Sequence, residues 1–132
     1  VYNELFKARE RGYEFVDYIT ESGILEVTPS NEEELGFLGE LREERRSLGL
    51  GELEGISICK HKGYIFVTND TTAKKVCDRY RIEFIDFSMI LKSLFATKIL
   101  TGNELRVLIS EIERKDKVII IDKDDILAES SD

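Results

Sequence analysis

The sequence has few of the residues that stabilise small secreted domains or bind zinc. Its 132 residues include two cysteines, one histidine, one proline and no tryptophan. Two cysteines and one histidine are too few for a disulfide framework or a Cys/His zinc site. We therefore expect a protein of the reducing cytoplasm, with Cys59 and Cys77 as small core residues and His61 exposed to solvent at a helix end.

Long apolar runs and an excess of positive charge are also lacking. No stretch of about 18 apolar residues occurs, so the sequence predicts no membrane span, and no charged-then-apolar leader opens it. The chain carries 19 Lys and Arg against 27 Asp and Glu, a formal net charge of −8. So negative a chain excludes nucleic-acid binding driven by overall charge. Any contact with RNA must therefore be local.

The composition, with 42% hydrophobic residues, is ordinary for a globular protein, and the length fits a single domain. Helical spacing alternates with short apolar runs, which predicts an α/β protein. Because such chains form parallel sheets with helices on both faces, we expect a three-layer α/β/α fold with a central parallel sheet. The predicted strands are residues 23–29, 64–69, 82–86 and 117–122. The predicted helices are residues 1–11, 30–49, 52–62, 71–80, 87–100 and 103–115. Residues 13–20 are ambiguous, although the break at Gly12 allows a second short helix there.

The helix predicted at residues 30–49 has the clearest start signal. Ser30 suits the N-cap and Glu33 the third helical position, the spacing of a capping box. Leu35, Leu38 and Leu41 would then form a narrow apolar stripe. The charges between them are interpreted as a solvated face.

The stretch "GYIFVTNDTTAKK" places a carboxylate, Asp70, between an apolar strand and a helix. In open α/β sheets ligands bind beyond the carboxyl ends of the strands, so Asp70 is a candidate site residue. It also suits the N-cap of the following helix. Thr68 is expected to orient Asp70 or a water molecule. Nearby basic residues would either guide an RNA backbone or be ordinary surface residues: Lys60, Lys62, Lys74, Lys75, Arg79 and Arg81.

Three stretches carry a resemblance to a known family: "VYNEL", "LGLGELEGISICKHKGYIFVTNDTTAKKVCDRYRIEFID" and "FSMILKSLFATKILTGNEL". They resemble PIN domains, metal-dependent ribonucleases that include toxins of toxin–antitoxin pairs. The most similar subgroup has a V-x-x-E-L helix, then "GE" at the start of a helix, then a strand ending in T-D-D before x-x-A-R. A segment of the form hhLxxAKxxGxI follows. Glu4, Glu52 and Asp70 fall at acidic positions of this series.

The resemblance implies one PIN-like domain over residues 1–132 that hydrolyses RNA with Mg²⁺ or Mn²⁺. Glu4, Glu52 and Asp70 would bind the metal and, with Thr68, form the catalytic site. Hard carboxylate oxygens select these ions, and a bound ion lowers the pKa of a water molecule and offsets charge on the phosphate. The resemblance further implies an antitoxin-type protein partner and a homodimer, with the apolar residues of 87–100 as the expected interface.

The sequence departs from the family pattern at three points. The family's first strand, which ends in a metal-binding Asp, is not in this chain, so we expect an N-terminally truncated domain. Asn69 replaces the first Asp of T-D-D, and Lys74 stands where the subgroup has Arg. These departures favour an alternative, a catalytically weakened PIN-like module that binds RNA or a protein. A permuted chain could also use Asp122, at the end of the predicted strand 117–122, as the missing ligand.

Each acidic residue also has an ordinary structural interpretation. Glu52 suits the first turn of a helix, where the helix dipole favours a negative charge, and Glu4 suits an exposed helix surface. A third hypothesis is an unrelated small α/β domain that binds a ligand or accepts a phosphate on Asp70. The sequence has no Gly-rich phosphate loop to support it.

Overall fold

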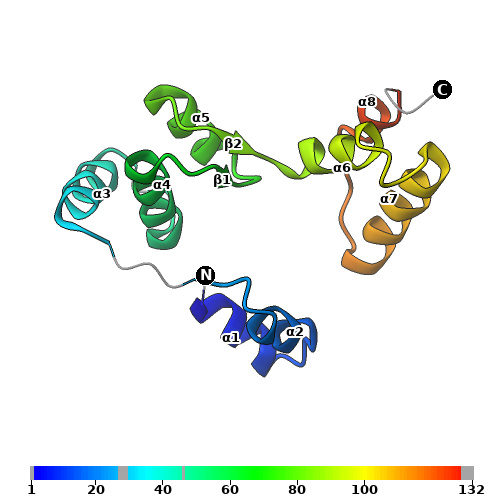
Figure 1. Ribbon diagram of the computed structural model, residues 1–132, viewed down its shortest axis with the longest axis horizontal. Helices are drawn as coiled ribbons and strands as arrows, with labels where there is room; N and C mark the ends of the chain where they lie inside the picture. The colour runs from blue at the N-terminus through cyan, green and yellow to red at the C-terminus, as the bar shows by residue number, and fades with distance from the viewer. Residues whose placement is uncertain (1, 27–29, 46, 129–132) are drawn as a thin grey trace. The chain divides into compact units, whose positions relative to one another are not determined.

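The computed structural model describes residues 2–26, 30–45 and 47–128 of the chain. It divides into two compact units, Val1–Lys62 and Gly63–Asp132. Figure 1 shows that helices make up most of both units. The expected three-layer fold is therefore wrong: within the described residues, the strands amount to one parallel pair and no central sheet with helices on both faces.

The first two helices form a hairpin. α1 (Tyr2–Glu10) confirms the helix predicted at residues 1–11, and α2 (Phe15–Glu21) shows that the ambiguous segment 13–20 is largely helical. Gly12 lies between them with φ +89°, a conformation that glycine adopts without a steric penalty. Arg9 Nε lies 2.8 Å from Asp17 Oδ1 and links the two helices. Of the strand predicted at 23–29, residues 24–26 are irregular and 27–29 lie outside the described residues.

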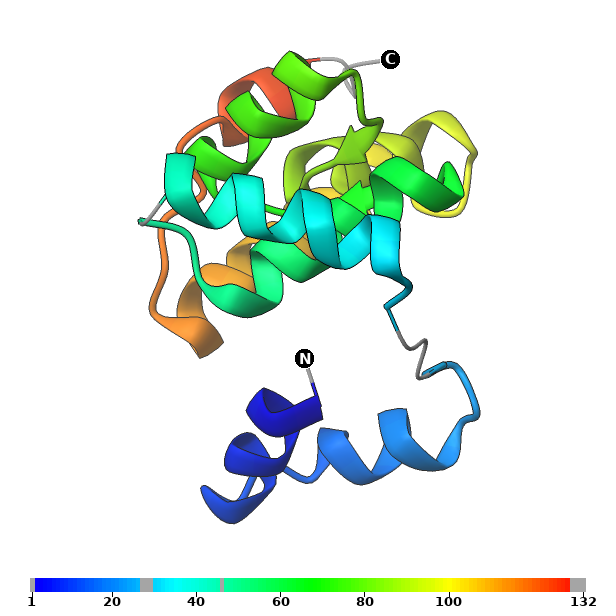
Figure 2. The same ribbon diagram turned by 90° about the vertical axis from the view of Figure 1, so that its left-hand side faces the viewer.

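α3 (Glu32–Glu44) and α4 (Leu50–Lys62) lie side by side, as Figure 2 shows. The capping box at the start of α3 exists, but it lies one residue later than predicted. The Asn31 side chain accepts a hydrogen bond from the Glu34 amide, and the Glu34 carboxylate accepts one from the Asn31 amide, both at 2.9 Å. Asn31, and not Ser30, is therefore the N-cap.

The apolar stripe predicted for α3 is also only partly correct. Leu41 is fully buried, but Leu35 is 53% exposed, and Glu34 and Phe37 are buried instead. The burial of Glu34 is compensated only in part: its Oε2 accepts the hydrogen bond of the cap, whereas Oε1 has Lys62 Nζ at 3.8 Å and accepts no hydrogen bond from the described residues. An isolated buried carboxylate would be costly, so these contacts allow a charged residue at this core position.

The second unit begins with a strand–helix–strand segment. β1 (Phe66–Val67) pairs in parallel with β2 (Phe84–Ile85), with Phe66 opposite Phe84, and α5 (Thr71–Tyr80) connects them. The predicted strand 117–122 is wrong, because no backbone pairing partner lies beside it among the described residues. Lys117, in the left-handed conformation, ends α7 (Gly102–Asp116) at this point.

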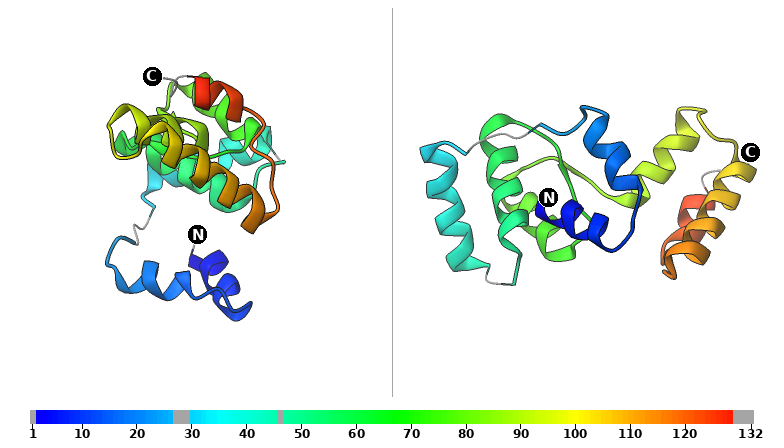
Figure 3. Two further views of the ribbon diagram at one scale, coloured as in Figure 1. Left: turned by 90° about the vertical axis from the view of Figure 1, so that its right-hand side faces the viewer. Right: turned by 90° about the horizontal axis from the view of Figure 1, so that it is seen from below.

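The core of the second unit lies among three helices, shown in Figure 3: α6 (Phe87–Ala96), α7 and α8 (Lys123–Ala128). Thr101 and Glu104 form a second capping box at the start of α7. Ile120 is buried whereas Ile119 and Ile121 are exposed, so one residue of the predicted strand joins this helical core. The buried residues of the cluster are Leu91, Leu105, Ile109, Ile120 and Ile126.

Both cysteines are buried, as predicted, and neither forms a disulfide. Burial raises the pKa of the Cys59 thiol, which disfavours the reactive thiolate and fits a core residue. His61 is exposed, as predicted, although its Nδ1 lies 2.8 Å from the Ser57 carbonyl oxygen and its ring meets the Phe37 ring edge-on.

The helical core of the second unit predicts a position-dependent loss of stability. Leu105→Ala should lower the free energy of unfolding by about 2–5 kcal/mol, because it removes a fully buried side chain and leaves a cavity. Val107→Ala on the same helix should change it by no more than about 0.5 kcal/mol, since Val107 is 62% exposed. Urea unfolding followed by circular dichroism measures both. Equal effects would contradict the assigned core.

Candidate functional site

The carboxyl ends of β1 and β2 form one polar edge in the second unit. Thr68 N donates to the Ile85 carbonyl oxygen at 3.1 Å, so the strand pairing continues one residue beyond β1. Each strand is then followed by a carboxylate and a helix: Asp70 precedes α5 and Asp86 precedes α6. We call this group the strand-end site; its residues are Thr68, Asn69, Asp70, Lys74 and Asp86.

Asp70 is the N-cap of α5, as the sequence predicted. Its Oδ1 accepts a hydrogen bond from the Ala73 amide at 2.8 Å, and its own amide donates to Thr68 Oγ1 at 3.1 Å. Thr68 therefore helps to fix the backbone at Asp70. Asp70 Oδ2 accepts no hydrogen bond from the described residues and is the oxygen that a cation or a water molecule could approach.

Asp86 occupies the equivalent position at the end of β2, and the sequence analysis did not select it. Its Oδ1 accepts from the Met89 amide at 2.9 Å, and its Oδ2 lies 2.6 Å from Lys74 Nζ. The hydrogen bond from Lys74 and that from the Met89 amide lower the pKa of Asp86. The signal was available, since "IEFID" before a helix repeats the strand–carboxylate–helix order of the Asp70 segment.

Asn69 joins the two halves of the strand-end site. Its side-chain oxygen accepts a hydrogen bond from the Phe87 amide at 2.9 Å, in the first turn of α6. An Asp at this position could accept the same bond but would add a second negative charge beside Asp70. The neutral side chain keeps the contact without adding a negative charge near Asp70 and Asp86.

The two other predicted metal ligands lie in the first unit. Glu4 is exposed in the first turn of α1. Glu52 lies in the first turn of α4, where its Oε2 accepts a hydrogen bond from the Gly49 amide at 3.0 Å. Glu52 therefore has the structural role that its sequence position indicated. Among residues 2–26, 30–45 and 47–128, no three or more His, Cys, Asp or Glu side chains form a group that could hold a metal ion.

Asp122, the ligand considered for a permuted chain, lies before α8. The Ser88 hydroxyl donates to Asp122 Oδ2, which ties the start of α6 to the start of α8. The Asp122 carbonyl oxygen accepts from the Ile126 amide at 3.0 Å. Asp122 thus follows a turn and not a strand, and the structure gives it a role in joining helices.

The basic residues that were candidates for guiding RNA are partly engaged within the protein. Lys60 lies 5.3 Å from the centre of the Phe37 ring, and Lys62 pairs with Glu34. Lys74 pairs with Asp86 in the strand-end site. Arg79 lies over the ring of Tyr80 at 5.6 Å. Lys75 is exposed on the same helix, next to Lys74 in the sequence.

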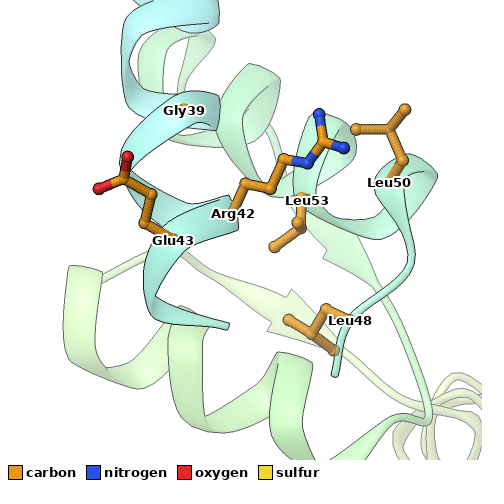
Figure 4. Close-up of a pocket in the computed structure, with 6 residues that line it drawn as sticks. All are labelled: Gly39, Arg42, Glu43, Leu48, Leu50 and Leu53. Atoms are coloured by element: carbon orange, nitrogen blue, oxygen red, sulfur yellow. The ribbon is translucent and has the colours of Figure 1, made fainter. Parts of the chain in front are cut away.

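A separate cleft lies between α3 and α4 in the first unit. Figure 4 shows the residues that line it: Gly39, Arg42, Glu43, Leu48, Leu50 and Leu53. None of these residues was predicted from the sequence as a site residue. They come from α3, from the loop before α4 and from α4 itself, so no single sequence pattern brings them together. The cleft forms only when the two helices pack.

The ion pair of the strand-end site predicts a change in one pKa. Lys74→Met should raise the pKa of Asp86 toward its ordinary value, because the first cause of the lowering is removed. Lys75→Met is the matched control and should leave the pKa of Asp86 unchanged. Carboxyl carbon chemical shifts followed by NMR against pH measure both variants. An unaltered Asp86 titration in Lys74→Met would show that the pair does not exist in solution.

The same pair has a consequence for stability against pH. Because the pKa of Asp86 is lowered in the folded state, its ionisation stabilises the protein above the ordinary pKa of an aspartate. That stabilisation is lost as the pH falls through the lowered pKa of the folded state. Asp86→Asn should remove this part of the pH dependence, as measured by urea unfolding between neutral and acidic pH. An identical pH dependence in both proteins would contradict the assignment.

Comparison of the chain with protein-family models, with curated proteins and with solved structures finds no match. No helix within the described residues has the length and apolar character needed to cross a membrane. A functional proposal for this chain therefore rests on its residues and on the strand-end site.

Proposed function

We propose that this chain is a Mg²⁺- or Mn²⁺-dependent ribonuclease of the PIN type that uses the strand-end site. The observation that supports this most is Asp70 at the carboxyl end of β1, with one carboxylate oxygen that accepts no hydrogen bond from the described residues. Mg²⁺ in phosphoryl chemistry is often bound by only one or two carboxylates together with phosphate oxygens and water. Asp70 fits such a donor set.

The residues around Asp70 have separate tasks in this proposal. A divalent ion, when bound, supplies an activated water and offsets negative charge on the phosphate. Thr68 accepts from the Asp70 amide, which leaves its hydroxyl hydrogen free to donate to a water molecule or a phosphate oxygen. Lys74 balances the charge of Asp86 and keeps this carboxylate ionised beside Asp70. The PIN resemblance adds Glu4 and Glu52 as further metal ligands.

A second candidate is a catalytically weakened PIN-like module that binds RNA or a protein. The specific observation in its favour is that both oxygens of Asp86 are engaged, one by the Met89 amide and the other by Lys74. Asn69 is neutral, so Asp70 is the carboxylate of the strand-end site with an oxygen to spare. Such a site would hold a divalent ion less tightly than a site with several free carboxylates.

The proposal includes the cellular setting that the family resemblance implies. Two buried cysteines that form no disulfide suit the reducing cytoplasm. An antitoxin-type protein would be the natural inhibitor, and a homodimer through residues 87–100 remains a prediction. Within that segment Met89 is 45% exposed and Leu91 is buried, so only part of its apolar surface is available to a second copy.

The nuclease proposal predicts metal-dependent cleavage that Asp70 controls. The purified chain should cleave single-stranded RNA in the presence of MnCl₂ and should stop when EDTA is added. Asp70→Asn should lower the cleavage rate by at least about tenfold. Loss of a residue that only hydrogen-bonds to a metal ligand typically costs about that much, and loss of a ligand should cost no less. Asn is as good an N-cap as Asp, so folding should be preserved. Gel analysis of a labelled RNA measures the rate, and circular dichroism checks the fold.

Matched variants separate the proposed ligands from other carboxylates. Asp78→Asn removes an exposed carboxylate from α5 and should leave cleavage unchanged. Glu52→Gln and Glu4→Gln test the two ligands implied by the resemblance, each by itself. RNA binding without cleavage in the unaltered protein would contradict the nuclease proposal and support the weakened module. Cleavage that survives Asp70→Asn would contradict the role of the strand-end site.

A further inference from the structure

The cleft between α3 and α4 is large enough for a small organic ligand. Its volume is about 680 Å³, within the range of roughly 300–1,000 Å³ found for small-molecule sites. It lies entirely within the first unit and shares no residue with the strand-end site. Ligand binding in this cleft would therefore be independent of the proposed nuclease function.

The apolar part of the cleft comes from three leucines. Leu48 and Leu53 are buried in the protein, whereas Leu50, at the start of α4, is 58% exposed. Gly39 contributes no side chain on the α3 side, and a Cβ placed there would meet no other atom within 4 Å. Leu50 thus supplies most of the accessible aliphatic surface of the cleft, the buried Leu48 and Leu53 add little to it, and this surface lies beside open space that suits a flexible hydrocarbon chain.

The charge that faces the cleft is positive. In Figure 4 the guanidinium group of Arg42 extends across the cleft toward Leu50, whereas the carboxylate of Glu43 points away from it. Within the described part of the chain Arg42 forms no ion pair. Arg42 is exposed, and its guanidinium group is the positive charge that would attract an anion to this cleft.

We propose that this cleft binds a small aliphatic carboxylate. The carboxylate group would lie on Arg42, whose planar fork of N–H donors matches the two carboxylate oxygens. The hydrocarbon chain would pack on Leu48, Leu50 and Leu53. An aliphatic amine would meet the Arg42 cation with a like charge, so the cleft discriminates between ligands of the same size by the charge of their head group.

Octanoate is the probe for the test, with octanol and octylamine as comparison ligands of the same chain length. Titration of the full chain, followed by ¹H–¹⁵N NMR, should give saturable shifts at Leu48, Leu50 and Leu53 with octanoate. Octylamine should bind at least about tenfold more weakly, because charge-assisted hydrogen bonds of this kind typically contribute a factor of ten or more. Equal binding of octanoate and octylamine, or no saturable shift with octanoate, would overturn the proposal.

Two glycines on α3 supply a matched pair of variants. Gly39→Leu places a side chain in the cleft and should abolish the octanoate shifts. Gly36→Leu lies one turn earlier, does not line the cleft and should leave binding unchanged. Both replace a glycine inside the same helix that has open space at its Cβ, so both should stabilise α3 and keep the protein folded. Equal loss of binding in both variants would overturn the assigned position.

Arg42→Met tests the head-group contact separately from the apolar one. It should weaken octanoate about tenfold and leave octanol unchanged, because Met keeps the aliphatic stem and removes the charge. A variant that weakens both ligands equally would show that Arg42 does not recognise the carboxylate. That result would contradict the proposal even if the cleft still binds hydrocarbon chains.

Discussion

The ion pair between Lys74 and Asp86 is the contact that holds the strand-end site together. Lys74 projects from α5, which follows β1, and Asp86 ends β2 and caps α6. One side-chain contact of 2.6 Å therefore links two strands and two helices at a single edge. The strands are only two residues long, so their backbone pairing alone is a weak restraint. The side-chain contacts at the ends of the strands supply the remaining restraint on how the two strands pair.

Capping and ligand binding make competing demands on the same carboxylates. Asp70 gives one oxygen to the Ala73 amide and keeps the other, whereas Asp86 gives both of its oxygens to the protein. A carboxylate that is fully engaged contributes to stability and is less available to a cation. The difference between two residues in equivalent positions explains why Asp70 is the functional candidate and Asp86 is the structural one.

Two charged residues of α3, Glu34 and Arg42, differ in burial and in pairing where α3 packs on α4. Glu34 is buried; its Oε2 accepts from the Asn31 amide at the start of the helix, whereas its Oε1 has only Lys62 Nζ, at 3.8 Å, near it and accepts no hydrogen bond from the described residues. Arg42 lies two turns later on α3 and is left at the mouth of the cleft. Packing of the same two helices thus leaves a partly paired carboxylate in the core and an exposed cation, Arg42, that forms no ion pair with the described residues.

The sequence by itself determined the local features: most helices, the cap at Asp70, the first-turn position of Glu52 and the burial of both cysteines. These depend on residues a few positions apart, which a linear pattern records. Tertiary structure decided which apolar runs pair as strands, since residues 117–122 have strand character and yet supply Ile120 to a helical core. It also decided the shift of the α3 cap to Asn31, because burial of Phe37 and Leu41 against neighbouring elements sets the rotation of that helix. The pairing of Lys74 with Asp86 joins residues 12 apart in sequence and exists only because two parallel strands end side by side.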